Sequence, residues 1–161
     1  MMILTFTNWL QDLPFAQTIA QGDWYFPGLE CLHVLALAVV FGSISMVDLR
    51  LVNLALKSRS IVQLEREVLP WTWIAFCLAV ITGGLMFSSA ATRYYGLWPF
   101  KVKMLLLACA GLNMLVFNLV LSKDVASWEH GATPVKARVA GWLSLILWTA
   151  IIVCGRWVGF L

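Results

Sequence analysis

Charged residues are scarce in this chain. Only 12% of its 161 residues are charged and 61% are hydrophobic, whereas soluble domains average about 25% charged and about 45–50% apolar residues. This composition excludes an ordinary soluble domain and predicts an integral membrane protein. The formal net charge of +3 is small and spread along the chain, so we expect no nucleic-acid partner.

Histidine and cysteine, the usual ligands of zinc, are also few. The chain has 2 histidines and 4 cysteines. It contains no Cys-x-x-Cys motif and no neighbouring pair of histidines, which argues against a zinc site. We interpret the cysteines as small buried apolar residues, one in each apolar stretch: Cys31, Cys77, Cys109 and Cys154.

No lysine or arginine occurs in the first 26 residues, so this segment lacks the basic region of a signal peptide. Polar residues and Pro14 interrupt its apolar run too often for a membrane span. The pattern predicts a short amphipathic helix that lies on the membrane and ends near residues 21–23. Trp24, Tyr25 and Phe26 follow as an aromatic belt.

Four apolar stretches are long enough to cross a bilayer, which takes about 20 residues per helix. The predicted spans cover about residues 27–56, 70–91, 99–122 and 136–161. Small residues recur at helix-packing spacing, for example Ala75, Ala79 and Gly83. We therefore predict an all-α fold, a four-transmembrane-helix bundle with an N-terminal interfacial helix over residues 1–26, as a single integral membrane domain over residues 1–161.

The basic residues are distributed unequally between the two ends of the predicted bundle. Seven belong to the connections 57–69 and 123–135 or to the adjoining helix ends, and four lie at the other end. The positive-inside rule therefore predicts that these connections are cytoplasmic and that both termini are periplasmic. The expected location is the inner membrane of a bacterium.

Ionisable residues inside spans are the most informative feature, because each costs about 2.5–3.5 kcal/mol to insert at the centre of a bilayer. Glu30 and His33 lie one turn apart on one face of the first predicted span. Four cations share their outer third of the bundle: Arg93, Lys101, Lys103 and Arg156. This pattern fits a haem b whose iron is bound by His33 and whose propionates pair with Arg and Lys.

The second axial ligand is left open by the sequence. The other histidine, His130, falls in the predicted cytoplasmic loop at the opposite face, which excludes a bis-histidine site within one chain. Met86, Met104 or Lys103 could bind the iron, or the iron is five-coordinate. In the alternative reading, His33 and Glu30 hydrogen-bond each other and the cations extend to the membrane interface.

Other polar residues have simpler interpretations. Asp48 and Arg50, at the inner end of the first span, could bind each other, a neighbouring helix end or a lipid headgroup. Five further polar residues are expected to form hydrogen bonds across helices: Thr82, Ser88, Ser89, Asn113 and Asn118.

Several of these residues also carry a resemblance to known families. The residues that carry the first resemblance are Glu30-Cys31-Leu32-His33, Gly42, Asp48-Leu49-Arg50, Pro70-Trp71-Thr72-Trp73, Thr82-Gly83, Phe100-Lys101-Val102-Lys103-Met104 and Gly155-Arg156-Trp157. Through them the chain resembles, over nearly its whole length, an uncharacterised family of small bacterial four-helix membrane proteins. This resemblance implies the fold but no reaction.

A more distant resemblance is to HemJ-type protoporphyrinogen oxidases and CopD-type copper resistance membrane domains, through His33, Arg50 and Lys103. The HemJ resemblance implies haem b and electron transfer to the respiratory chain. The segment 51–54 lacks the second histidine of that pattern, and the Asn-Glu-x-Pro signature before the last span is absent. Asn118 also stands where relatives of the small family tend to carry a histidine. The oxidase activity itself is therefore not predicted.

Three functions remain as expectations. The first is a haem b-binding electron-transfer or quinone-linked redox protein, in which Lys103, Arg93 and Arg156 contact the propionates or a quinone headgroup. The second is a non-catalytic membrane subunit or scaffold that binds partner helices and lipid, as a homo-oligomer or within a membrane complex. The third is copper or small-solute transport, for which the sequence offers no Met-x-x-Met motif. No catalytic residue is assigned.

Overall fold

The computed structural model describes residues 2–121, 125 and 133–161, and every regular element in this part of the chain is helical. The N-terminal segment forms two short helices, since Pro14 begins the second of them. A π-helical turn, η1, directly continues α6. The elements are α1 (Met2–Gln11), α2 (Pro14–Gln21), α3 (Tyr25–Leu51), α4 (Ile61–Ser89), α5 (Ala91–Gly96), α6 (Trp98–Val116), η1 (Phe117–Leu121) and α8 (Val135–Val158).

Four helices are long and apolar enough to cross a membrane: α3, α4, α6 with its extension to Val120, and α8. The predicted all-α fold with four spanning helices is confirmed. Large apolar side chains such as Leu35, Leu105 and Ile146 are 60–65% exposed along these helices, as expected where lipid is the surrounding solvent. The prediction for the cysteines is wrong for three of the four. Only Cys154 is partly buried, while Cys31, Cys77 and Cys109 lie on the exposed surface.

Two predicted span limits differ from the helix ends. Helix α3 ends at Leu51, before the predicted limit at 56, because Asn53 and Leu56 adopt the left-handed conformation with φ of 60° and 54°. Helix α4 begins at Ile61, well before the predicted limit at 70. The Ser60 side chain caps it by accepting a hydrogen bond from the Gln63 amide at 3.3 Å, and Pro70 is accommodated inside the helix.

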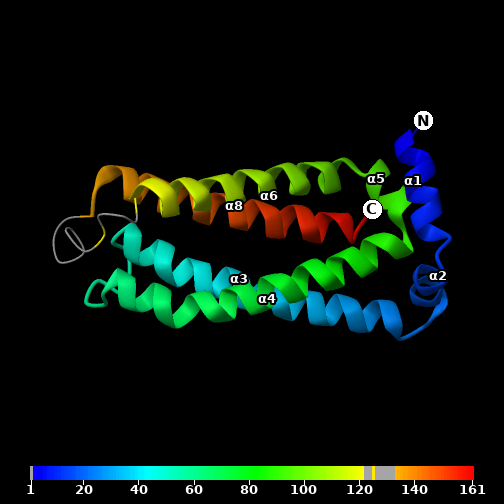
Figure 1. The fold of residues 1–161 in the computed structure, drawn as a ribbon, viewed down its shortest axis with the longest axis horizontal. Helices are drawn as coiled ribbons and strands as arrows, with labels where there is room; N and C mark the ends of the chain where they lie inside the picture. Colours follow the sequence, from blue (N-terminus) through cyan, green and yellow to red (C-terminus); the bar gives the residue numbers. More distant parts are fainter. Residues whose placement is uncertain (1, 122–124, 126–132) are drawn as a thin grey trace.

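The spanning helices form two antiparallel pairs, α3 with α4 and α6 with α8, which meet mainly through α3 and α8 (Figure 1). Helices α1, α2 and α5 lie with the C-terminus at one end of the bundle, here called the terminal end (Figure 1). The α3–α4 connection, residues 52–60, marks the opposite end, here called the loop end. Within the second pair, the Asn113 side chain of α6 donates a hydrogen bond to the Ala140 carbonyl of α8 at 3.1 Å, which joins these two helices.

Hydrogen bonds attach α1 to the terminal end. The Thr92 amide at the start of α5 donates to Gln11 Oε1 at 2.9 Å, and the Thr92 hydroxyl contacts Asn8 Oδ1 at 3.0 Å. The apolar side chains of Phe6 and Trp9 are more than half exposed. Helix α1 therefore fixes its polar face to the bundle and presents its apolar face outward, as an interfacial helix does.

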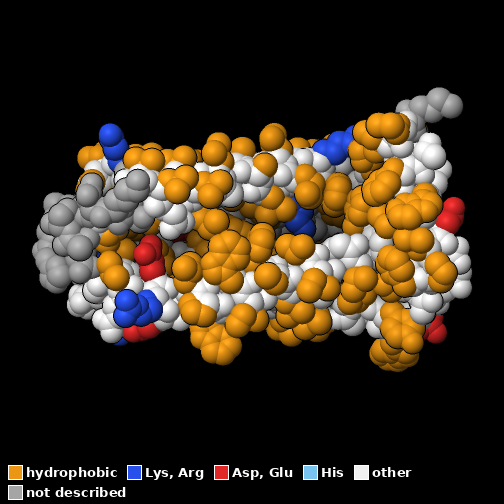
Figure 2. Space-filling model, viewed as in Figure 1, with side chains coloured by type: hydrophobic (Ala, Val, Ile, Leu, Met, Phe, Trp, Pro, Cys, Tyr) orange, Lys and Arg blue, Asp and Glu red, His pale blue; other side chains and the backbone are white. Residues whose placement is uncertain are grey.

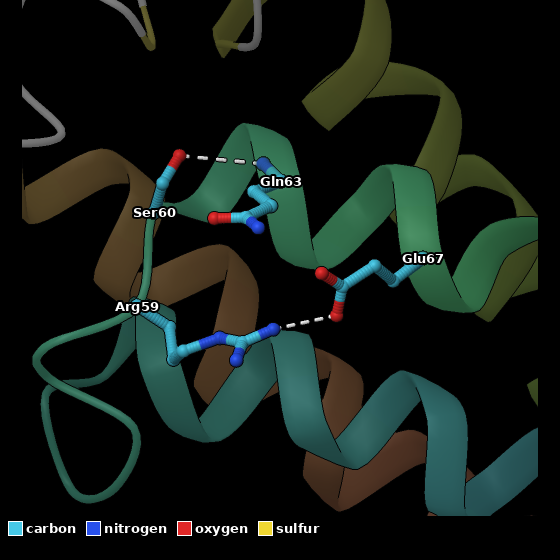
Figure 3. A network of polar contacts seen from close by, with 4 residues as sticks. All are labelled: Arg59, Ser60, Gln63 and Glu67. Carbon is cyan, nitrogen blue, oxygen red and sulfur yellow. Dashed lines mark hydrogen bonds and ion pairs between the residues drawn. The ribbon is translucent and has the colours of Figure 1, made fainter.

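The loop end is held by polar contacts around Arg59 and Arg50. Figure 3 shows Arg59 paired with Glu67 at 2.6 Å, next to the Ser60 cap of α4. Arg50 donates from Nε to the Arg59 carbonyl at 2.8 Å and from Nη1 to Asn53 Oδ1 at 3.3 Å. Arg50 thus binds the neighbouring connection, which is one of the alternatives that the sequence left open.

Of the five residues expected to bond across helices, Asn113 and Thr82 do so. Asn113 bonds Ala140 as described above, and Thr82 bonds His33 of α3. The described hydrogen bond of Asn118 goes to the Met114 carbonyl in the same chain segment, at 2.9 Å. The hydroxyls of Ser88 and Ser89 donate within α4, to the Leu85 carbonyl at 2.7 Å and to the Met86 carbonyl at 2.8 Å.

Replacing Gly141 with alanine is expected to destabilise the protein by about 1–3 kcal/mol through overpacking. A Cβ at Gly141 of α8 would lie 3.1 Å from Val52 Cγ1, 3.2 Å from Leu51 Cβ and 3.3 Å from the Asp48 carbonyl oxygen. Gly84→Ala is the matched control, because nothing lies within 4 Å of its Cβ position. Thermal unfolding in detergent measures both variants, and a Gly141→Ala protein as stable as Gly84→Ala would contradict this account of the α3–α8 contact.

Candidate cofactor site

His33 is held on α3 by a hydrogen bond to α4. Its Nδ1 lies 2.9 Å from the Thr82 hydroxyl oxygen, and Thr82 is only 2% exposed. The same hydroxyl donates to the Leu78 carbonyl at 2.8 Å. Because a hydroxyl has one proton, both contacts form together only when His33 donates from Nδ1. This tautomer leaves Nε2 unprotonated and able to bind a metal ion.

Gly83 provides the space for the His33 ring. A Cβ at this position would lie 3.0 Å from His33 Cε1 and 3.5 Å from Nδ1. Since glycine has no side chain, the imidazole can pack directly on the α4 backbone. Thr82 therefore fixes the orientation of the ring, and Gly83 lets it approach.

Lys103 faces this region from the second helix pair. Its side chain is partly buried and passes along α8, where a Cβ at Gly155 would lie 3.4 Å from Lys103 Nζ. Its charge is close enough to act on the His33 ring. Figure 2 shows basic atoms inside a hollow between the two helix pairs, surrounded by apolar side chains. A histidine from one pair and a lysine from the other thus share the terminal half of the bundle.

The remaining predicted cations lie on the surface. Arg93 and Lys101 are exposed, and the Lys101 ammonium lies 4.9 Å from the centroid of the Tyr95 ring. Arg156 is also exposed, with its guanidinium 5.0 Å from the Phe160 ring centroid. These cation–π contacts keep the charges at the periphery of the terminal end. The structure brings only Lys103 of the four cations close to His33.

Glu30 is partly buried one turn before His33 and acts on it electrostatically. The hydrogen bonds described for the His33 ring go to α4, to the Thr82 hydroxyl and to the Ala79 backbone. Glu30 also acts on Tyr94 of α5, which lies outside the spans. Burial raises the pKa of the Tyr94 phenol above its ordinary value, so this hydroxyl stays protonated at neutral pH.

An aromatic cluster beside Glu30 was not expected from the sequence. The Phe87 and Phe100 rings stack with their centroids 5.2 Å apart, and Tyr94 lies 6.0 Å from Phe100. These residues come from α4, α5 and α6. They pack the corner where the three helices meet, at the same end of the bundle as His33.

The two candidate methionine ligands differ in position. Met86 follows Thr82 by four residues on α4, which puts it on the same helix face, and it is partly buried. Met104 is 50% exposed on α6. Within the described residues no group of three or more His, Cys, Asp and Glu side chains could hold a metal ion. His130 lies outside the described residues, so its prediction is untested.

The fold and these residues define a multi-pass helical membrane protein with a fixed, partly buried histidine. The chain belongs to a family of unknown function, DUF6644, whose model matches residues 15–161. No curated protein and no solved structure matches the chain. The comparisons therefore support the resemblance to a small membrane-protein family and give no support to similarity with HemJ-type or CopD-type proteins.

Proposed function

We propose that the protein binds haem b through His33 Nε2 and transfers electrons within the membrane, to or from a quinone. The observation that carries this proposal is the hydrogen bond from His33 Nδ1 to Thr82, at 2.9 Å. Histidines that bind metals commonly donate their other ring nitrogen to a fixed acceptor, which sets the tautomer and the ring orientation. Haem supplies one-electron redox chemistry when it is bound in this way.

The residues around His33 fit this group by their chemistry. Gly83 lets the imidazole pack directly on the α4 backbone, and Lys103 supplies a cation in the same region. Arg93 and Arg156 are exposed at the terminal end, where they would pair with propionates near the membrane surface. Met86 is the better candidate than Met104 for a second ligand, because it shares the helix face of Thr82.

The proposed setting is the inner membrane of a bacterium with both termini on the periplasmic side. The distribution of basic residues along the sequence supports it, since seven of the eleven belong to the loop end. In this orientation the proposed haem lies in the periplasmic half of the bilayer.

The test is the absorption spectrum of the detergent-purified protein, oxidised and dithionite-reduced, together with a pyridine haemochrome assay. A Soret band with reduced α and β bands and a stoichiometry of about one haem per chain is the expected result. A colourless protein from haem-replete cells overturns the proposal.

A second candidate function is a non-catalytic membrane subunit, which is favoured by an apolar groove between α3 and α4. The groove contains the buried Ala36 and Ala75 and the exposed Trp71 and Ile74. Small residues let another helix approach closely in a bilayer. A colourless protein that co-purifies with partner helices or as an oligomer is the result that favours this candidate.

Replacing Lys103 with glutamine is expected to lower the midpoint potential of the bound haem. A cation near the site favours the reduced iron, which carries one positive charge less, so its removal favours the oxidised form. Lys101→Gln is the matched control, since Lys101 is exposed beside Tyr95. A redox titration followed at the α band measures both variants, and equal shifts would contradict the placement of Lys103.

A further inference from the structure

Asp48 is a deeply buried carboxyl group far along α3 from His33. It lies in the last turn of α3 and is only 6% exposed. The Ser144 hydroxyl of α8 hydrogen-bonds this carboxyl group. The Oδ2 atom of Asp48, however, has no hydrogen-bond partner among the described residues. Ser45, one turn earlier, has a buried hydroxyl oxygen that also lacks a partner there. Hydroxyl and carboxyl oxygens thus gather where α3 meets α8.

No described cation compensates a charge on Asp48. Arg50, the basic residue nearest in sequence, directs Nε to the Arg59 carbonyl and Nη1 to Asn53. The group that faces Asp48 from α8 is the neutral Ser144 hydroxyl, and no charged side chain of α4, including the partly buried Glu65, acts on it. The C-terminal end of a helix also carries partial negative charge, which disfavours a nearby carboxylate.

An ionised carboxylate in this position would carry a large desolvation penalty, because it would be a buried charge without a counter-ion among the described residues. A neutral carboxylic acid avoids this penalty and gains a donor. The Ser45 hydroxyl lies on the same helix face, but no hydrogen bond joins it to Oδ2. The unpartnered Oδ2 atom is where the proton fits best.

We propose that Asp48 is a proton-binding site within the membrane, that it is occupied at neutral pH, and that the bound proton keeps α3 packed against α8. The proton comes from water and adds to the carboxylate to give the neutral acid, so no other reactant is involved. Gly141 of α8 lies against the Asp48 carbonyl, where a Cβ would be 3.3 Å from that oxygen. Loss of the proton places an unpaired charge at this close contact and loosens it.

Infrared spectroscopy of the full-length protein tests the protonation directly. The wild-type protein at neutral pH is expected to show the C=O stretch of a buried protonated carboxyl group, and Asp48→Asn is expected to lose it. Asp23→Asn is the matched control, because Asp23 is exposed. If the wild-type band is missing, or if it persists in Asp48→Asn, the proposal is overturned.

The pH dependence of stability tests the role in packing. A proton held by the folded protein and released on unfolding makes stability fall as the pH rises, by up to tenfold in the unfolding equilibrium constant per pH unit. Asp48→Asn resembles the neutral acid in shape, so it is expected to be as stable as wild type at neutral pH and to lose this pH dependence. A variant that unfolds at neutral pH would show that the negative charge is needed, and the proposal would fail.

Both outcomes are independent of haem. The infrared band and the pH dependence concern the loop end, and neither requires that His33 binds a cofactor. A colourless protein that shows the Asp48 band would retain this inference while the proposed function fails.

Discussion

Purified His33→Ala protein is expected to show no Soret band. Alanine removes the only imidazole that the described residues place inside a span, and with it the nitrogen proposed to bind the iron. Absorption spectra of wild type and variant, prepared from the same haem-replete cells, measure the expected complete loss.

Two controls separate loss of the ligand from loss of the fold. His130→Ala removes the other histidine of the chain and is expected to keep the wild-type spectrum. Helical circular dichroism and gel-filtration elution show whether His33→Ala remains folded, and added imidazole is expected to restore part of the Soret band in the folded variant. An unchanged spectrum in His33→Ala would refute the ligand assignment.

The four spans could be predicted from the sequence because long apolar runs have few alternatives in a bilayer. The helix ends were less predictable. Helix α3 ends where Asn53 and Leu56 take left-handed backbone conformations, and Leu56 is not a residue type that favours them. Helix α4 begins before the apolar run because Ser60 caps its first turn, and the charged residues 65–67 follow inside the helix.

The site was predictable only in part. His33 could be identified because an ionisable residue inside a span is costly and therefore informative. The partnership of Thr82 and Gly83 with this ring depends on the register between α3 and α4, which hydropathy does not encode. The aromatic cluster of Phe87, Tyr94 and Phe100 likewise depends on the corner between three helices.

The predicted cluster of four cations is divided in the structure, and helix geometry explains part of the division. Lys101 and Lys103 are two positions apart, which places them about 200° apart around a helix. Lys103 therefore points toward the bundle while Lys101 remains exposed. The prediction grouped the two residues by depth alone, although their spacing on α6 already indicates opposite faces.

Replacing Gly83 with valine is expected to reduce haem occupancy strongly. The first carbon of the new side chain would lie 3.0 Å from His33 Cε1, so the ring must move by a few tenths of an ångström even for alanine. Valine adds two further methyl groups at this position, and the hydrogen bond to Thr82 resists movement of the ring. Because iron ligation depends on ring orientation, the displaced His33 binds haem poorly.

The adjacent glycine makes this experiment specific. Gly84→Val places the same β-branched side chain one residue later on α4, where nothing lies within 4 Å of the Cβ position. Both variants make the same change in helix propensity, so a difference between them reports the contact with His33. Haem stoichiometry is expected to fall in Gly83→Val and to remain near the wild-type value in Gly84→Val, with both proteins folded by circular dichroism. If both variants bind haem equally, the position of the His33 ring does not depend on the space at Gly83, and the haem-binding site is not the one proposed.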